Sequence, residues 1–220
     1  MDIAERLYQL KSELPENVRL LAVSKFHSES VIMEAYRAGQ RIFGENRVQE
    51  LLPKCEHLPK DIEWHFIGHL QANKVKYIVP FIHTIQSIDN LKLAETVNRE
   101  AGKRKRKIRV LLQIHIAEEE QKFGFSYGEA DDLLKNGALL SLENLNISGL
   151  MGMATFTDNH TQIREEFHRL HHFFQQAKND YFTNSDSFNE LSIGMSDDYL
   201  IAAEEGSTMV RIGSKLFGPR

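Results

Sequence analysis

The chain has 220 residues, 41% hydrophobic and 26% charged, which is ordinary for a soluble globular protein with one substantial core. Its formal net charge of -4 argues against a general nucleic-acid-binding surface. The single cysteine, Cys55, excludes an internal disulfide framework and suits a reducing cytoplasm.

The N-terminal stretch alternates charged and apolar residues at helical spacing, which predicts a helix over residues 2–12. This stretch lacks the continuous apolar core of a signal peptide or membrane anchor. No later apolar run is long enough to span a bilayer. We therefore expect a cytoplasmic protein that does not insert into membranes.

After this helix, short apolar runs alternate with amphipathic stretches along the whole chain. Such β–α alternation is typical of parallel strands with helices packed outside them. The predicted strands are residues 19–24, 41–43, 63–67, 81–85, 108–114, 146–150, 190–192 and 209–212. The predicted helices between them are residues 28–38, 47–55, 73–79, 90–101, 127–136, 163–179 and 199–205.

This order of elements favours a closed (β/α)8 barrel of the TIM type, with the N-terminal helix packed on it as an extra element. An open, doubly wound sheet is the alternative, but no G-x-G-x-x-G motif follows any predicted strand. No linker rich in Pro, Gly or Ser divides the chain. We therefore expect a single domain over residues 1–220.

The first predicted strand runs directly into a lysine, Lys25. In parallel α/β folds, ligands and chemistry gather at the carboxyl ends of the strands. A desolvated lysine amine at that edge can lose its proton and attack a carbonyl, forming a Schiff base. The alternative is a structural lysine whose amine extends from the strand end into water.

The stretches after the seventh and eighth predicted strands, residues 192–198 and 211–218, are rich in glycine and serine. Glycine lets backbone N–H groups approach an anion closely, and these two loops are the usual phosphate site of a barrel. Ser196 is also a candidate N-cap for the next helix, and Gly213-Ser214 is compatible with a plain turn. A Schiff-base lysine and a phosphate site on one rim indicate a phosphorylated aldehyde, either pyridoxal 5′-phosphate (PLP) or the substrate of a sugar-phosphate aldolase.

Long motifs along the chain narrow this choice. They are AVSK (22–25), GEN (44–46) with VQE (48–50), WHFIGHLQANK (64–74), KFGF (122–125), ISGLMGM (147–153), LSIGMSDD (191–198), RIG (211–213) and FG (217–218). Taken in this order, they resemble the YggS/PROSC family of pyridoxal phosphate homeostasis proteins over essentially the whole chain.

The resemblance implies the barrel fold of the alanine racemase N-terminal domain. It also implies a cytoplasmic protein that holds PLP as a Schiff base on Lys25 and helps to control vitamin B6 levels. Matching positions imply further cofactor-binding residues. Asn46 lies near the ring, Arg211 near the ring or phosphate, Ser196, Gly213 and Ser214 at the phosphate, and Ser192 and Met195 in the same phosphate-side motif.

Met151 and Met153 flank Gly152 at the same expected rim, where Met151 either fills the core or lines the cofactor. The chain departs from the family pattern beside the site. Phe26-His27 stands where a Thr-Lys-Pro type of sequence is expected, and Arg47 stands where tyrosine is common. We expect these departures to change access to the site without removing it.

The alternative function is that of a PLP-dependent amino-acid racemase or decarboxylase of the same fold. Such enzymes typically carry a second, β-rich domain, and no residues follow the last barrel motif to form one. An arginine beside the pyridine nitrogen, here Arg211, would also weaken the ring as an electron sink. We therefore expect a monomeric carrier without catalytic residues, whose partners are PLP and apo forms of PLP-dependent enzymes.

The basic run at residues 103–107 precedes the fifth predicted strand, opposite the expected ligand site. We interpret it as a solvated loop rather than a nucleic-acid site.

Histidines occur in two places where a metal site has to be considered. His168, His171 and His172 lie on one predicted helix, but no H-E-x-x-H motif accompanies them, so we expect surface histidines. His65 and His69 are expected to shape the mouth of the barrel. We predict no metal site.

Overall fold

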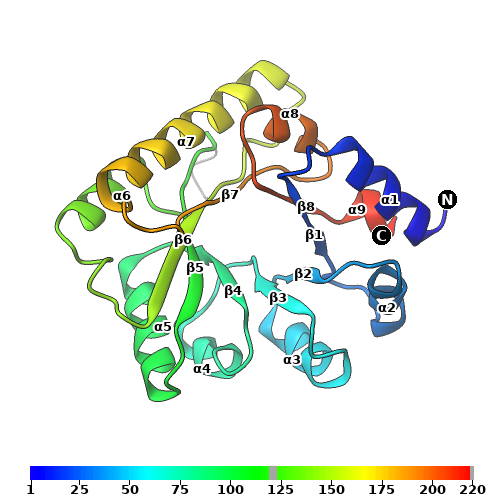
Figure 1. Ribbon diagram of the computed structural model, residues 1–220, viewed down its shortest axis with the longest axis horizontal. Coiled ribbons are helices and arrows are strands. Elements are labelled where there is room, and N and C mark those ends of the chain that lie inside the picture. Colours follow the sequence, from blue (N-terminus) through cyan, green and yellow to red (C-terminus); the bar gives the residue numbers. More distant parts are fainter. Residues whose placement is uncertain (119–122, 219–220) are drawn as a thin grey trace.

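The computed structural model describes residues 1–118 and 123–218, and its strands form one closed, parallel barrel in chain order (Figure 1). Lys122 of the KFGF motif lies outside the described residues. The predicted (β/α)8 barrel is confirmed. The strands are β1 (Arg19–Val23), β2 (Ile42–Glu45), β3 (Glu63–Phe66), β4 (Thr84–Ile88), β5 (Ile108–Gln113), β6 (Leu145–Met151), β7 (Glu190–Ser192) and β8 (Met209–Ile212).

Helices surround the barrel on its outside (Figure 1). Within residues 1–118 and 123–218, no helix is long and apolar enough to cross a membrane. The helices are α1 (Ile3–Glu13), α2 (Glu29–Arg37), α3 (Val48–His57), the 3-10 turn η1 (Ala72–Lys74), α4 (Val75–Ile78), α5 (Leu91–Lys103), α6 (Tyr127–Lys135), α7 (His160–Tyr181), α8 (Tyr199–Glu204) and α9 (Ser214–Phe217).

The extra helix α1 begins with a capping box, in which Asp2 and Glu5 each accept a hydrogen bond from the backbone N–H of the other. One face of α1 is apolar and buried, and it packs against α9 and α2. The Tyr199 hydroxyl at the start of α8 donates a hydrogen bond to Glu13 at the end of α1. Helix α1 therefore ties the beginning of the chain to its last helices.

Strand β4 begins at Thr84, three residues later than the sequence predicted. The backbone N–H groups of Phe81 and Ile82 donate to the carbonyl of Ile78, so these two residues complete the end of α4. Ile82 is fully buried, as a strand residue would be. A run of buried apolar residues fits a helix end and a strand equally well, which explains the error.

The basic run begins at the last residue of α5, Lys103, and its residues 104–107 form the connection from α5 to β5. Arg104 donates to the carbonyl of Lys76, and Arg106 donates to the carbonyls of Val79 and Ile82. These arginines satisfy carbonyl groups in α4 and in the turn that follows it. The loop that the sequence predicted is present in this run, and both arginines of the run have a structural role.

Gly149 in β6 has φ +152°, and a Cβ atom there would lie 1.7 Å from the carbonyl oxygen of Glu190 in β7. We predict that Gly149→Ala lowers the free energy of unfolding by about 3 kcal/mol or more, because the strands must separate to admit the methyl group. Urea denaturation measures the change. Gly128→Ala is the control, since Gly128 lies in α6 with open space around its Cα, and it should raise stability by about 0.5 kcal/mol. A Gly149→Ala protein as stable as the wild type would contradict this account of β6 and β7.

Candidate functional site at the carboxyl end of the barrel

A cleft of about 650 Å³ opens at the carboxyl ends of the strands. It is the place where a parallel barrel gathers residues from separate loops. Most of the residues that the sequence predicted for the site line this cleft: Lys25, Asn46, Met195, Ser196, Arg211, Gly213 and Ser214.

Two predicted residues lie elsewhere. Met151 and Ser192 are fully buried and are not among the residues that line the cleft. Met153, two residues after Met151, does line it. Ser192 reaches the cleft only through Arg211, to which it is hydrogen-bonded.

The ends of β1 and β2 are locked together beneath Lys25. The Ser24 hydroxyl donates to Glu45 Oε1 at 2.6 Å, and Lys54 Nζ donates to the same oxygen at 2.7 Å and to the Ser24 carbonyl at 3.0 Å. Glu45 is fully buried, and the Lys54 side chain is 8% exposed. Burial raises the pKa of the Glu45 carboxyl, although its contacts with Lys54 and Ser24 act in the opposite direction. This buried group fixes Ser24 and Glu45, the residues that directly precede Lys25 and Asn46.

Lys25 itself lies in the turn after β1 and is partly buried. The next residue, Phe26, has φ +66°, a conformation that costs a non-glycine residue energy. Its backbone N–H donates to Glu50 Oε2 at 2.8 Å. The turn that carries Lys25 is therefore held in place from α3.

Arg211 is 4% exposed and donates three hydrogen bonds at the base of the cleft. Nη1 donates to the Ser192 carbonyl at 2.7 Å and to Ser192 Oγ at 2.8 Å, and Nη2 donates to the Gly152 carbonyl at 2.8 Å. Burial lowers the pKa of Arg211 to about 10, and the nearby charge of Asp198 opposes this effect. At neutral pH the guanidinium is a fixed positive charge that cannot accept a proton.

The loops after β7 and β8 meet at Ser196. Its hydroxyl accepts a hydrogen bond from the backbone N–H of Gly213 at 3.4 Å. The prediction that Ser196 caps the next helix is wrong, because α8 begins at Tyr199 and its N-cap is Asp198. Asp198 Oδ1 instead accepts from the N–H of Met195 at 2.5 Å. The Ser196 side chain is thereby left on the wall of the cleft.

Asn46 contributes a buried polar atom that is available for a ligand. Its Oδ1 has no hydrogen-bond partner among residues 1–118 and 123–218. Gly68 packs against it so closely that a Cβ atom would lie 2.5 Å from the Asn46 carbonyl oxygen. A buried acceptor without a partner is costly, so this position favours a bound molecule that donates a hydrogen bond.

One wall of the cleft comes from residues that the sequence did not identify as ligand-binding. His69 Nδ1 lies 2.7 Å from Asp89 Oδ2, and its ring stacks on Phe123 with 3.8 Å between centroids. Gln113 Nε2 donates to the Phe123 carbonyl at 2.9 Å. His69 shapes the mouth as expected, but His65 is fully buried inside the barrel and does not line the cleft.

Two of the three residues expected to depart from the family pattern, Phe26 and Arg47, contact each other on the rim. The guanidinium of Arg47 lies 4.9 Å from the centre of the Phe26 ring, and it pairs with Glu50 at 3.7 Å. The ring of His27 lies 4.6 Å from that of Phe217. Of these departures only His27 lines the cleft, so they alter its edge rather than its base.

The comparisons with known proteins agree with the fold and the motifs. The family model "Alanine racemase, N-terminal domain" matches residues 2–220. The pyridoxal phosphate homeostasis protein of Pasteurella multocida is 37% identical, with 100% of this chain and 98% of that protein covered. That of Escherichia coli K12 is 36% identical, with 100% and 97% covered. This chain belongs to the family of pyridoxal phosphate homeostasis proteins.

Solved structures add two comparisons. PipY of Synechococcus elongatus, a family member solved without and with PLP, is 38% identical, and the alignment covers 99% of this chain and 100% of that one. The TM-scores are 0.92 for PipY without PLP and 0.89 for PipY with PLP. Alanine racemase of Clostridium difficile matches with a TM-score of 0.77 at 14% identity, over 100% of this chain and 56% of that one. The similarity to the racemase shows a shared fold only.

The buried Glu45–Lys54 pair generates a testable prediction. Lys54→Met should destabilise the protein by about 3 kcal/mol at pH 7, because it leaves a buried carboxylate without its cation. The loss should shrink in more acidic solution, since Glu45 already has a raised pKa and takes up a proton there. The measurement is urea denaturation of three variants: Lys54→Met, Glu45→Gln and the double variant that carries both changes. Strictly additive effects of the two changes would show that the pair is not coupled.

Proposed function

We propose that this protein binds PLP as a Schiff base on Lys25 and serves intracellular vitamin B6 homeostasis without turning over a substrate. The observation that carries the proposal is the meeting of Lys25, Arg211 and the Ser196–Gly213 contact in one cleft. Family membership supports it, because the relative PipY has been solved with PLP bound.

The residues of the cleft fit this cofactor. Its volume of about 650 Å³ lies within the usual range for small-molecule sites. Arg211 supplies positive charge for a phosphorylated aldehyde, and the unpartnered Asn46 Oδ1 accepts a hydrogen bond from it. Met195 and Met153 contribute apolar surface to the same cleft.

Each residue has a distinct role in the proposal. Lys25 supplies the amine that joins the aldehyde. Ser196, Gly213 and Ser214 hold the phosphate with hydroxyl and backbone N–H groups. Arg211 lies beside the pyridine ring, and Ser192 acts through Arg211 by holding its guanidinium. Met151 packs inside the barrel beneath the cleft.

The character of Arg211 favours a carrier over an enzyme. When bound, PLP supplies an electron sink for amino-acid chemistry, and that sink is strongest with a protonated ring nitrogen. A guanidinium at this nitrogen disfavours protonation, because two like charges would then lie side by side. Three hydrogen bonds hold Arg211 in place, so it cannot turn away to relieve this repulsion.

The cellular setting is part of the same proposal. A single, partly buried cysteine, whose pKa is raised by burial, suits a reducing cytoplasm. Apo forms of PLP-dependent enzymes are the natural recipients of a carried cofactor. We infer that the protein acts on them as a monomer.

Borohydride trapping tests the cofactor and its attachment. Purified protein mixed with PLP should develop a visible imine band, and reduction followed by mass spectrometry should place the label on Lys25. Lys25→Ala should lose both the band and the label. Lys215→Ala is the matched control, because Lys215 lies at the same end of the barrel in α9 and should leave labelling unchanged. Labels scattered over surface lysines, or no band at all, would refute the attachment.

An assay for turnover tests the second half of the proposal. We expect no racemisation or decarboxylation of amino acids by the PLP-loaded protein above the level of free PLP. A reproducible rate that disappears in Lys25→Ala would show an enzyme of the racemase or decarboxylase type.

The visible spectrum of loaded Arg211→Glu, recorded between pH 6 and 9, should differ from that of the wild type if Arg211 sets the charge of the ring.

A further inference from the structure

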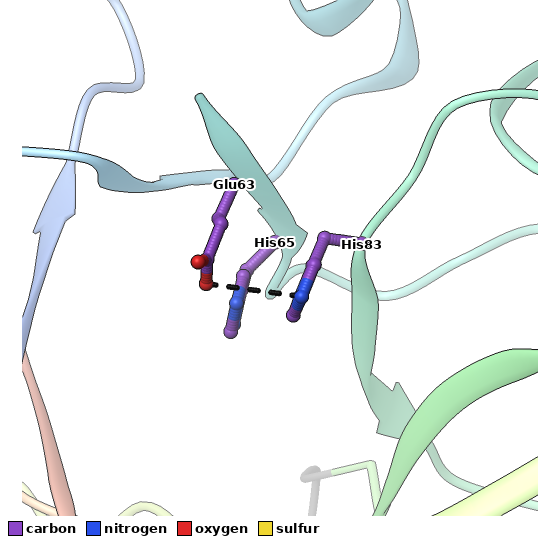
Figure 2. Close-up of side chains that lie close together, drawn as sticks. All are labelled: Glu63, His65 and His83. Carbon is purple, nitrogen blue, oxygen red and sulfur yellow. Dashed lines mark ion pairs between the residues drawn. The ribbon is translucent and has the colours of Figure 1, made fainter. Parts of the chain in front are cut away.

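A second group of ligating side chains lies at the amino end of the barrel, away from the cleft. Glu63, His65 and His83 each offer one potential ligand atom, and these atoms lie within 4.8 Å of one another (Figure 2). Glu63 is the first residue of β3, and His83 directly precedes β4. Nothing in the proposed cofactor chemistry uses this group.

The barrel backbone determines this arrangement. Residues at alternate positions of a strand share a face, so Glu63 and His65 lie on one side of β3 and Trp64 lies on the other. The N–H of His83 donates to the Trp64 carbonyl at 3.0 Å, which fixes His83 next to β3. The two imidazole rings stack with 5.4 Å between centroids and an angle of 10° between their planes. Figure 2 shows Glu63 beside these parallel rings.

His65 is the strongest sign of a ligand. It is fully buried, and its Nε2 has no hydrogen-bond partner among residues 1–118 and 123–218. A buried ring nitrogen without a partner costs free energy, and native proteins seldom leave one. Since the other nitrogen, Nδ1, lies 2.8 Å from Gln86 Nε2, the ring is held in one orientation with Nε2 unused.

Burial favours the neutral form of both histidines. Burial lowers the pKa of His65 well below its usual value, and the neighbouring His83, Arg19 and Arg109 add to the effect. Burial also lowers the pKa of His83, although Glu63 opposes this. A neutral imidazole is the form that binds a metal ion.

We propose that Glu63, His65 and His83 form a binding site for a divalent transition-metal ion, with Zn²⁺ as the preferred occupant. Two imidazoles and one carboxylate are a ligand set that suits Zn²⁺. Bonds of about 2.0–2.1 Å in tetrahedral geometry require ligand atoms about 3.3 Å apart. The Glu63 and His83 side chains are 40% and 43% exposed, so they can close on the ion while His65 stays fixed.

Neighbouring groups support the two rings. The Thr84 hydroxyl lies 2.9 Å from His83 Nδ1 and can accept its proton, which leaves Nε2 for the metal. For His65 to bind through Nε2, Nδ1 must carry the ring proton, and Gln86 must present its amide oxygen to it. That oxygen now accepts from Ser192 Oγ at 2.7 Å. The proposed metal binding therefore requires the Gln86 amide to rotate, so that its oxygen faces His65 Nδ1 and its nitrogen faces Ser192 Oγ.

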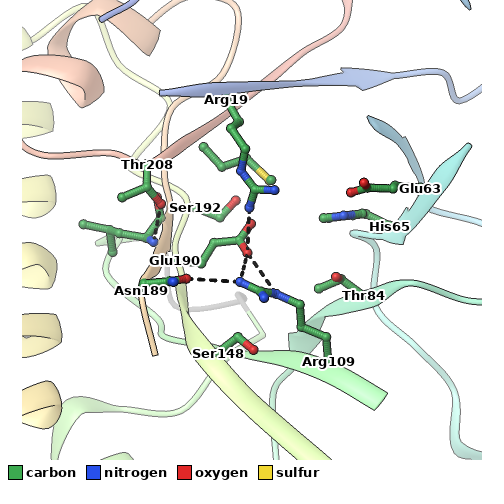
Figure 3. Close-up of polar contacts among 12 residues, drawn as sticks. Arg19, Glu63, His65, Thr84, Arg109, Ser148, Asn189, Glu190, Ser192 and Thr208 are labelled. Carbon is green, nitrogen blue, oxygen red and sulfur yellow. Dashed lines mark hydrogen bonds and ion pairs between the residues drawn. The ribbon is translucent and has the colours of Figure 1, made fainter. Parts of the chain in front are cut away.

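Two arginines lie near the site, but a carboxylate offsets their charge. Arg19 and Arg109 both pair with Glu190, at 3.1 and 2.8 Å, and Figure 3 shows both guanidinium groups directed at this carboxylate. Asn189 Oδ1 accepts a further hydrogen bond from Arg109 at 3.2 Å. Glu63 and Glu190 together balance the two cations, so the ion enters a region without excess positive charge.

Titration of the whole protein with ZnCl₂ in a calorimeter tests the site. The wild type should bind one ion tightly, and Glu63→Gln and His83→Ala should each weaken that binding by at least about 100-fold. Co²⁺ should give the intense visible bands of a tetrahedral complex with the wild type and lose them with both variants. Thermal melts confirm that these variants, changed at partly exposed side chains, remain folded.

His168→Ala is the matched control, because His168 also pairs with a carboxylate, Glu205 at 3.1 Å, but its side chain is 71% exposed on α7. It should leave the tight site unchanged. Thr84→Val, which removes the partner of His83 Nδ1, should weaken binding by about 10-fold or more without removing a ligand. A wild type that binds no Zn²⁺ at about 100 µM, or binding unaltered in both Glu63→Gln and His83→Ala, would overturn the proposal.

Discussion

The pairing of β1 with β8 is the constraint on which the rest of the molecule depends. Arg19 pairs with Met209 and Ala22 with Ile212, so the first and last strands close the barrel in register. The cleft exists because of this closure, since Lys25 follows β1 while Arg211 and Gly213 belong to the end of the chain. Without closure, the residues of the cleft would lie at opposite edges of an open sheet. The packing of α1 against α9 reinforces the same junction.

The interior of the barrel is held by polar contacts as well as apolar packing. A continuous chain of hydrogen bonds runs from Arg211 through Ser192 and Gln86 to His65. Every member is buried, so the loss of one partner would leave another group unsatisfied, at a cost of about 1–3 kcal/mol. The chain thus holds Arg211 in one orientation at the cleft and His65 in one orientation at the opposite end. Its hydrogen bonds account for buried serine and glutamine in a place where aliphatic residues would pack as well.

Sequence patterns predicted what depends on local periodicity and on strand ends. The alternation of strands and helices gave the barrel, and Lys25, Ser196 and Gly213 were placed on one face because parallel strands share a carboxyl edge. The start of β4 was missed, since Ile82 is as buried after a helix end as it would be in a strand, and Phe81 is partly buried beside it.

Contacts between distant segments could not be read in this way. The His69–Asp89 pair and the stacking on Phe123 join three separate loops, and no local pattern marks them. The role expected for His65 was wrong for a similar reason. Its place near the end of a strand suggested the mouth, but β3 is only four residues long, and the ring points into the barrel toward Gln86.

Phe26 and Arg47 contact each other on the rim beside Lys25. Phe26 adopts a left-handed conformation that costs a residue with a side chain about 1–3 kcal/mol. Its backbone N–H bond to Glu50 and the position of Arg47 over its ring help to offset this cost. Arg47 and Phe26 therefore act as a pair through the ring contact, while the backbone bond to Glu50 holds the turn next to Lys25. Neither side chain lines the cleft, so the pair shapes the turn beside Lys25 and not the base of the cleft.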